Sequence, residues 1–170
     1  MQQVIVQKFG GTSVGSGERI AAVAEIIKNE AEMNTVVVVV SAMAGETDRL
    51  IELSKLFGDN PNTREFDALI STGEKVSASL LAMALNSLGL KAKSYSAAQV
   101  SLKTTSNFSK AKILDIDKAK MEEILADGSI PIITGFQGIT ETGEVTTLGR
   151  GGSDTTAVAI AASLKANRCD

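Results

Sequence analysis

The sequence has no histidine and no tryptophan, and it has one cysteine and two prolines among 170 residues. Without histidine, Ser-His-Asp and Cys-His catalysis are excluded, and the commonest general base and metal ligand are missing. The single cysteine, Cys169, cannot form an internal disulfide. Five phenylalanines, one tyrosine and a net charge of −3 provide neither a stacking platform nor a basic stripe for nucleic acid. The composition therefore favours a protein that handles small ligands.

Long apolar runs are also scarce. Hydrophobic stretches fall short of the ~20 residues that span a bilayer. Met1 opens onto a polar pair and a short strand instead of the basic and apolar regions of a signal peptide. We therefore expect a cytoplasmic protein with no membrane partner. With 44% hydrophobic residues the chain can bury one core, so a single domain is expected.

Residues 36–40 are five consecutive valines, too apolar a run for a strand with one solvated face. Such a strand suits the centre of a sheet that helices cover on both faces. Strand-like and helix-like segments alternate around it, which is typical of βαβ units. The predicted fold class is therefore α/β, a three-layer sandwich with a mostly parallel central sheet. The other predicted strands are 4–8, 91–95 and 130–134, and the predicted helices are 18–33, 47–57, 65–88 with a break near Gly73, 118–126 and 155–164.

Several local signals mark the ends of these elements. Ser16 and Asp117 are candidate N-caps, and Gly89 and Gly128 stand where helix C-caps belong. The polar turn 141–144 lies between two apolar residues and predicts an antiparallel hairpin attached to the sheet.

The most informative segment is 4–15, in which an apolar strand runs into Lys8 and a glycine-rich turn. Gly10, Gly11 and Gly15 lack a Cβ atom, so backbone N–H groups there can approach an anion closely. A helix follows, and its N-terminus would lie near the same anion. The order differs from that of a P-loop, because the lysine precedes the glycines. The segment predicts a phosphate site, and the alternative is a tight turn beside a solvated lysine.

Ser41 opens a loop of small residues, 41–45, directly after the valine strand, and Thr47 lies just beyond it. Ligands of open α/β sheets bind at the carboxyl ends of the strands, where small side chains let them reach backbone and hydroxyl groups. The alternative is an ordinary strand-to-helix loop with Thr47 as the N-cap.

A second glycine-rich loop, 149–154, precedes the last predicted helix. Its glycines can donate backbone N–H bonds to an anion, and Arg150 offers the planar fork that fits a carboxylate or phosphate. Asp154 could orient a lysine or a water bound to Mg²⁺. In the alternative, Ser153 or Asp154 caps the helix and Arg150 is a surface residue. Two such loops, each with a cation, favour an anion site over two simple turns.

Glu74 places an acid in an otherwise apolar helical segment. If its side chain points inward it needs a cationic partner, because an isolated buried carboxylate is costly. A ligand ammonium, Lys75 or a neighbouring lysine would serve, and a solvated Glu74 is an equal alternative.

Together these groups suit phosphoryl transfer to an amino acid: Glu74 for an ammonium, Arg150 for a carboxylate, and Lys8 with its glycines for phosphate. Such transfer depends mainly on positioning and charge neutralisation. A carboxylate acceptor needs no deprotonation at pH 7, so the absence of histidine is no obstacle.

The segments 8–14, 41–45, 73–74, 135–138 and 147–154 resemble, in order, those of bacterial aspartokinases. The resemblance covers essentially the whole chain. It implies the amino acid kinase fold and the reaction ATP + L-aspartate → ADP + 4-phospho-L-aspartate, the first step of lysine, threonine and methionine synthesis.

The resemblance also implies roles for residues. Lys8 would hold the transferring phosphoryl group, with Gly10, Gly11 and Ser41 along the phosphate path, and Asp154 would organise the lysines around the phosphates.

Four further residues would hold L-aspartate, with Glu74 facing its ammonium and Arg150 its α-carboxylate; the other two are Thr47 and Ser153. ATP would carry most of the coordination of Mg²⁺, so no metal site on the protein is expected.

Aspartokinases continue where this chain stops at residue 170, with a further strand, much of the nucleotide pocket, another lysine and regulatory ACT domains. We therefore expect 1–170 to be part of the catalytic domain without ACT domains, with weak or no activity alone. We also expect an exposed apolar surface and a homo-oligomer. The alternatives are a non-catalytic fragment that binds aspartate or an anion, and a kinase of the same fold acting on glutamate, acetylglutamate or uridylate.

Overall fold

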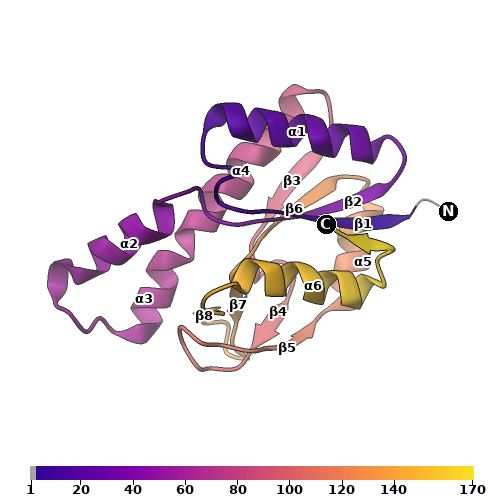
Figure 1. Ribbon diagram of the computed structural model, residues 1–170. Coiled ribbons are helices and arrows are strands. Elements are labelled where there is room, and N and C mark those ends of the chain that lie inside the picture. The colour runs from indigo at the N-terminus through magenta and orange to yellow at the C-terminus, as the bar shows by residue number, and fades with distance from the viewer. Residues whose placement is uncertain (1–2) are drawn as a thin grey trace.

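The computed structural model describes residues 3–170 and has a five-stranded sheet at its centre (Figure 1). Every neighbouring pair of strands in this sheet is parallel. The predicted α/β sandwich with a mostly parallel sheet is confirmed. In spatial order the strands are β3 (Ala92–Tyr95), β6 (Ile130–Thr134), β2 (Thr35–Val40), β1 (Val4–Phe9) and β9 (Arg168–Cys169).

The valine strand β2 lies in the middle of the sheet, as its composition predicts. Val36, Val38 and Val40 pack into one buried cluster, and Val37 and Val39 pack into another on the opposite face. Because side chains alternate along a strand, five valines in a row supply both cores at once.

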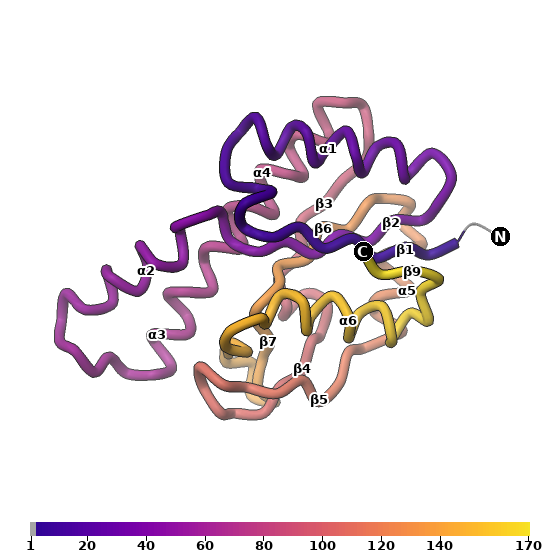
Figure 2. Tube along the Cα trace, viewed as in Figure 1, coloured from indigo at the N-terminus to yellow at the C-terminus, as the bar shows by residue number. Residues whose placement is uncertain are grey.

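Helices cover both faces of the sheet (Figures 1 and 2). Helices α1 (Gly17–Ala31) and α4 (Thr72–Ser87) bury apolar residues against one face, and α5 (Lys118–Ala126) and α6 (Gly152–Leu164) bury theirs on the other. The molecule therefore has the three predicted layers.

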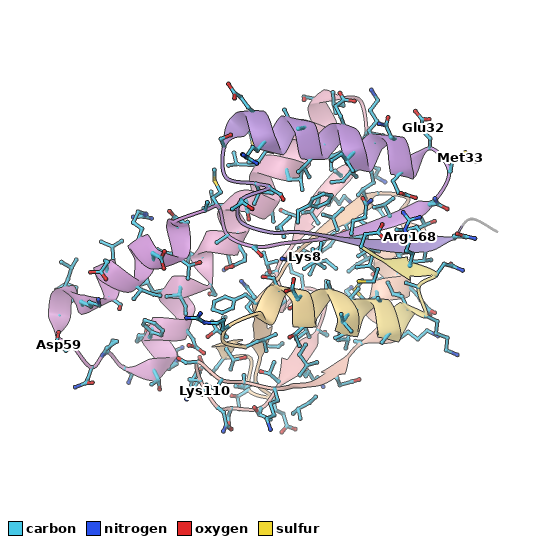
Figure 3. The ribbon with its side chains drawn as sticks, in the orientation of Figure 1. Lys8, Glu32, Met33, Asp59, Lys110 and Arg168 are labelled. Carbon is cyan, nitrogen blue, oxygen red and sulfur yellow. The ribbon has the colours of Figure 1, made fainter. Side chains whose placement is uncertain are left out.

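A helical arm extends beyond the sheet, formed by α2 (Glu46–Ser54), the short 3₁₀ helix η1 (Lys55–Phe57) and α3 (Thr63–Ile70). Figure 3 labels Asp59 at its outer tip. The single helix predicted over 65–88 is α3 followed by α4, and the break falls at Ser71, two residues before Gly73. By length and composition alone, Thr63–Ser87 could cross a membrane, but half of its apolar window is buried inside the protein. The break at Ser71 and the burial of half of the window are typical of two consecutive helices that pack in a protein core.

A second sheet of four short strands packs beneath the first: β5 (Ile113–Ile116), β4 (Leu102–Thr104), β7 (Gln137–Ile139) and β8 (Val145–Thr147). The predicted hairpin is confirmed as the antiparallel pair β7 and β8. The sequence-based prediction omitted β4, β5 and β9. Strands of two to four residues carry little local signal, and their neighbours determine them.

Most predicted helix ends are confirmed. Ser16 and Asp117 cap α1 and α5 by accepting backbone N–H bonds, and Gly89 and Gly128 have positive φ. The prediction that α6 begins at residue 155 was wrong, because α6 begins at Gly152 with Gly151 as its N-cap. This places Ser153 and Asp154 inside the first turn, so neither is a cap. Similarly, Gly45 and not Thr47 caps α2.

Candidate functional site

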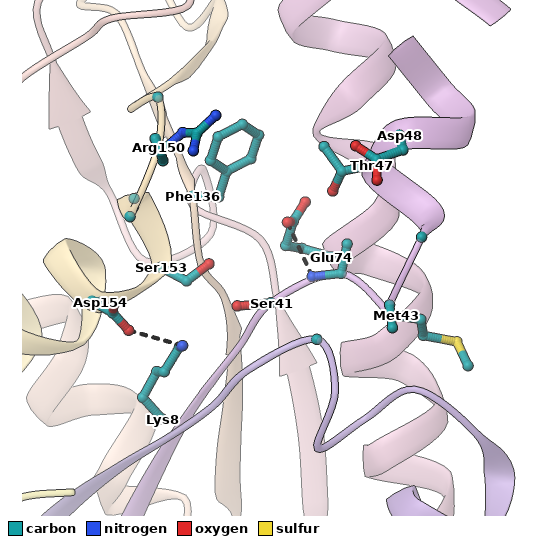
Figure 4. A pocket seen from close by; sticks show the side chains of 17 residues that line it. Lys8, Ser41, Met43, Thr47, Asp48, Glu74, Phe136, Arg150, Ser153 and Asp154 are labelled. Carbon is teal, nitrogen blue, oxygen red and sulfur yellow. Dashed lines mark hydrogen bonds and ion pairs between the residues drawn. The ribbon is translucent and has the colours of Figure 1, made fainter. Parts of the chain in front are cut away.

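A cavity of about 320 Å³ opens at the carboxyl ends of β1 and β2, between the loop 41–45 and the loop 149–154 (Figure 4). This is the edge where ligands of open α/β sheets bind. Eight of the nine predicted site residues line it: Lys8, Gly11, Ser41, Thr47, Glu74, Arg150, Ser153 and Asp154. The structure thus brings together residues that lie up to 146 positions apart, counting from Lys8 to Asp154.

Lys8 and Asp154 form the charged floor of this cavity. Lys8 Nζ lies 2.8 Å from Asp154 Oδ1, with the lysine side chain 23% exposed and the carboxylate 69% exposed. Gly10 does not line the cavity, but a Cβ atom at Gly10 would lie 3.3 Å from Lys8 Nζ. The absence of a side chain at position 10 therefore leaves room for the ammonium group of Lys8.

The first glycine-rich turn packs directly on the loop 41–45. Ala44 N–H donates to Gly11 O at 3.0 Å, and a Cβ atom on Gly11 would lie only 2.8 Å from Ala42 O. A side chain at position 11 would separate the two loops, so glycine is required here by close approach of two backbones.

Glu74 lies in the first turn of α4 and is 2% exposed. Its Oε1 accepts a hydrogen bond from Ala42 N–H at 3.1 Å, whereas no group among residues 3–170 donates to its Oε2. Burial raises the pKa of Glu74 to about 7, against the lowering effect of backbone hydrogen bonds at Glu74 and Ala42. A cation that entered the cavity would compensate this buried carboxylate.

Lys75 does not supply that cation. It lines a separate cavity with Ser79, Ser94 and Gln99, among others, and forms no ion pair with Glu74 in the described part of the chain. Of the sequence-based alternatives, the solvated Glu74 is wrong because the side chain is buried.

Arg150 lines the cavity on the wall opposite Glu74 (Figure 4). Positive φ angles at Gly149 (79°) and Gly151 (75°) turn the backbone on either side of it. Ser153 follows in the first turn of α6 and is packed against Gly135, where a Cβ atom would lie 2.7 Å from Ser153 Cβ. A cation and a buried carboxylate thus face a common space, which suits a zwitterionic ligand.

Phe136 and Asp48 also line the cavity, and neither was predicted as a site residue. Phe136 has a positive φ of 70°, which is unusual for a phenylalanine, and its N–H donates to Thr156 Oγ1 at 3.2 Å. No periodic pattern predicts such a conformation. Asp48 lies in the first turn of α2 next to Thr47, and its proximity to the loop 41–45 was the available signal.

Within residues 3–170 no cluster of three or more histidine, cysteine, aspartate or glutamate side chains is arranged to hold a metal ion. Fold and cavity together define an α/β protein with a cavity between two glycine-rich loops at the carboxyl edge of a parallel sheet.

The comparisons agree with this class. The model of the amino acid kinase family matches residues 3–170, so the chain belongs to that family. It is 55% identical over 168 residues to the aspartokinase of Geobacillus stearothermophilus and 54% identical over 167 residues to the aspartate kinase of Pseudomonas putida. Each of these alignments covers 98% of this chain and 41% of the relative, so the chain spans less than half the length of these proteins.

Solved structures give the same result for the fold. The aspartate kinase of Synechocystis superposes with a TM-score of 0.82 at 48% identity, covering 97% of this chain and 27% of that one. Aspartokinase III of E. coli, in complex with aspartate and ADP, superposes with a TM-score of 0.83 at 26% identity, covering 99% of this chain and 48% of that one.

Proposed function

We propose that the protein to which this chain belongs transfers the γ-phosphoryl group of ATP to the side-chain carboxylate of L-aspartate, giving 4-phospho-L-aspartate. The observation that carries the proposal is the buried, half-paired Glu74 carboxylate facing Arg150 across one cavity. Relatives above 50% identity are named aspartokinase or aspartate kinase, which supports the same reaction. The activity is proposed for the whole protein, in which 1–170 forms part of the catalytic domain.

On the acceptor side, Glu74 Oε2 receives the α-ammonium of aspartate, and Arg150 binds its α-carboxylate in a bidentate manner. Thr47 and Ser153, which line the same cavity, donate hydroxyl hydrogen bonds. Binding both α-substituents leaves the side-chain carboxylate directed toward Lys8, where the phosphoryl group arrives.

On the donor side, Lys8 neutralises charge on the phosphoryl group as it transfers, and Asp154 holds the lysine head group in place through their ion pair. Gly11 and Ser41 border the phosphate path, and Gly10 keeps it open beside Lys8. This combination of a lysine, small residues and a carboxylate fits the phosphates of ATP. Mg²⁺ carried by the nucleotide would neutralise further phosphate charge.

Calorimetric titration of the 170-residue chain with L-aspartate tests the acceptor half of the proposal. We expect binding that Arg150→Ala abolishes and that Arg19→Ala preserves. Arg19 is a matched control because it is an exposed arginine on α1 outside the cavity. Absence of aspartate binding by the folded wild-type chain would overturn the proposal for this site.

A substrate panel separates aspartate from the other acceptors of this fold. The full-length protein is assayed with ATP and L-aspartate, L-glutamate, N-acetyl-L-glutamate or uridylate. N-acetylation removes the ammonium that Glu74 would bind, and uridylate offers neither an α-ammonium nor an α-carboxylate. Preference for N-acetyl-L-glutamate or uridylate would contradict the assignment of L-aspartate as the acceptor. Binding of aspartate without turnover would favour a purely binding function. A homo-oligomer and a cytoplasmic location remain part of the proposal.

A further inference from the structure

Asp67 is the one fully buried acid of α3, with 0% of its surface exposed, and it does not line the cavity. Its carboxylate accepts four hydrogen bonds. Oδ2 accepts from the backbone N–H groups of Ser109 and Thr147, both at 2.7 Å. Oδ1 accepts from the hydroxyl groups of the same two residues, at 2.8 and 3.0 Å. Burial of a carboxylate is tolerated here because both oxygens are fully satisfied.

Ser109 and Thr147, which donate these hydrogen bonds, both lie next to the loop 149–154, which carries Arg150. Thr147 ends β8, three positions before Arg150. Ser109, in the loop 105–112, lies so close to this segment that a Cβ atom on Gly149 would be 3.2 Å from Ser109 O. Ala111 N–H also donates to Thr147 O at 3.0 Å, so the loop 105–112 is hydrogen-bonded to the end of β8. Asp67 therefore fixes both backbones against which the Arg150 loop rests.

At its C-terminal end, α3 is joined to α4, the helix that carries Glu74. Ser71 is both the C-cap of α3 and the N-cap of α4, so the two helices share one residue. Gln137 Nε2 donates to Ser71 O at 2.9 Å, which attaches β7 to the same junction. The helix pair thus has two buried contacts with the second sheet, one from Asp67 to Thr147 of β8 and one from Ser71 to Gln137 of β7.

We infer that Asp67 is a positioning residue for the acceptor site, because it sets the separation between Glu74 and Arg150. The inference rests on the proposed function for its meaning in catalysis. Without Asp67, four polar groups would lose their acceptor and the Arg150 loop would be free to move away from α3. A ligand that must contact Glu74 and Arg150 at once would then lose affinity, since small displacements of binding groups are costly.

The chemistry of the four donors provides a conservative rescue. In Asp67→Asn, the remaining oxygen can accept both backbone N–H groups, and the new NH₂ group can donate to the two hydroxyls, which can also act as acceptors. In Asp67→Leu, no acceptor remains. We therefore expect Asp67→Leu to weaken L-aspartate binding by about tenfold or more and Asp67→Asn to stay within about threefold of wild type.

Thr104→Val is the matched control. The Thr104 and Thr146 hydroxyls form a buried hydrogen bond of 2.5 Å inside the second sheet. Thr146 immediately precedes Thr147 on β8, and this hydrogen bond joins β8 to β4 and not to α3. This variant removes a buried hydrogen bond to β8, the strand that also carries Thr147, and is expected to leave aspartate affinity unchanged. In the full-length protein the KM for aspartate should rise in Asp67→Leu while the KM for ATP stays unchanged, a split that general destabilisation would not produce.

Amide hydrogen exchange of the segment 148–153 tests the inference without any ligand. Faster exchange in Asp67→Leu than in wild type, Asp67→Asn and Thr104→Val supports it, and equal exchange in folded Asp67→Leu overturns it.

If Asp67→Leu does not fold, a second variant tests the same contacts. Ser109→Ala combined with Thr147→Val removes the two hydroxyl donors and is expected to show a smaller effect of the same sign. No change in the exchange or the aspartate affinity of this double variant overturns the inference. Loss of affinity of equal size in Thr104→Val would also overturn it. Failure of the wild-type chain to bind aspartate would instead count against the proposed function, because the exchange result is independent of it.

Discussion

The Lys8 ammonium and the Asp154 carboxylate meet 2.8 Å apart at the floor of the cavity, one from the end of β1 and the other from the first turn of α6. Their approach joins the two glycine-rich loops across the sheet edge. Because the lysine is three-quarters buried and the carboxylate is largely exposed, the pair holds a positive charge in place while leaving it accessible to an anion.

Replacement of Asp154 by Asn should lower kcat of the full-length protein roughly a hundredfold, since it releases the Lys8 head group from its position beside the transferring phosphoryl group. Aspartate affinity should change little, because Glu74 and Arg150 remain. Steady-state kinetics and calorimetry measure the two effects. Lys28→Ala on α1 is the control, since Lys28 pairs with Glu25 away from the cavity. An unchanged kcat in Asp154→Asn would contradict the role of Asp154 in holding Lys8 in place.

Aspartate binding should be coupled to the release of a proton from Glu74. The free protein holds this proton up to about pH 7, because burial raises the pKa of Glu74 to about 7, whereas the ammonium of the ligand favours the carboxylate. Affinity should therefore fall by up to about tenfold per pH unit below pH 7. Calorimetry at pH 6 in buffers of different ionisation enthalpy measures the released proton. Glu74→Gln should bind weakly with no proton release, and a pH-independent wild-type affinity would count against the assignment.

The same group makes a pH-dependent contribution to stability. The native pKa of Glu74 lies above its ordinary value of 4.5, so between pH 4.5 and about 7 the native state retains a proton that the unfolded chain has lost. The contribution of Glu74 to the free energy of unfolding should thus be greatest below pH 4.5 and decline as pH rises toward 7. Urea unfolding of wild type and Glu74→Gln at pH 5 and pH 8 measures it. Wild type should lose stability relative to Glu74→Gln at the higher pH, and parallel profiles would contradict the prediction.

Gly11→Ala should destabilise the protein by about 1–3 kcal/mol, because its Cβ atom would lie 2.8 Å from Ala42 O and force the two loops apart. Thermal and urea unfolding measure the loss. Gly17→Ala provides the control, since a Cβ atom there meets nothing within 4 Å and alanine favours the helix. Equal stability of both variants would mean that the loops separate without cost.

The central sheet and the site loops could be predicted because their signals are local. Five consecutive valines require burial on both faces, and the turn beside Lys8 and the loop 41–45 follow β1 and β2, whose carboxyl ends share one edge of the parallel sheet. The loop that carries Arg150 follows β8 of the second sheet, and its glycines and its cation were the local signal. The second sheet was predicted only as a hairpin, since β4 and β5 are strands of three and four residues with little local signal, and β4 joins the hairpin through a pairing of Lys103 with the distant Ile139.

By itself, the sequence determined the fold class, the central strand and eight of the residues that line the cavity. Tertiary structure decided the state of the two buried acids. Glu74 could have been solvated or buried, and only packing of α4 on the loop 41–45 excludes water and raises its pKa. Asp67 finds its donors 42 and 80 positions away, at Ser109 and Thr147. No local pattern encodes such pairings, because the free energy of a buried charge depends on which groups the completed fold places around it.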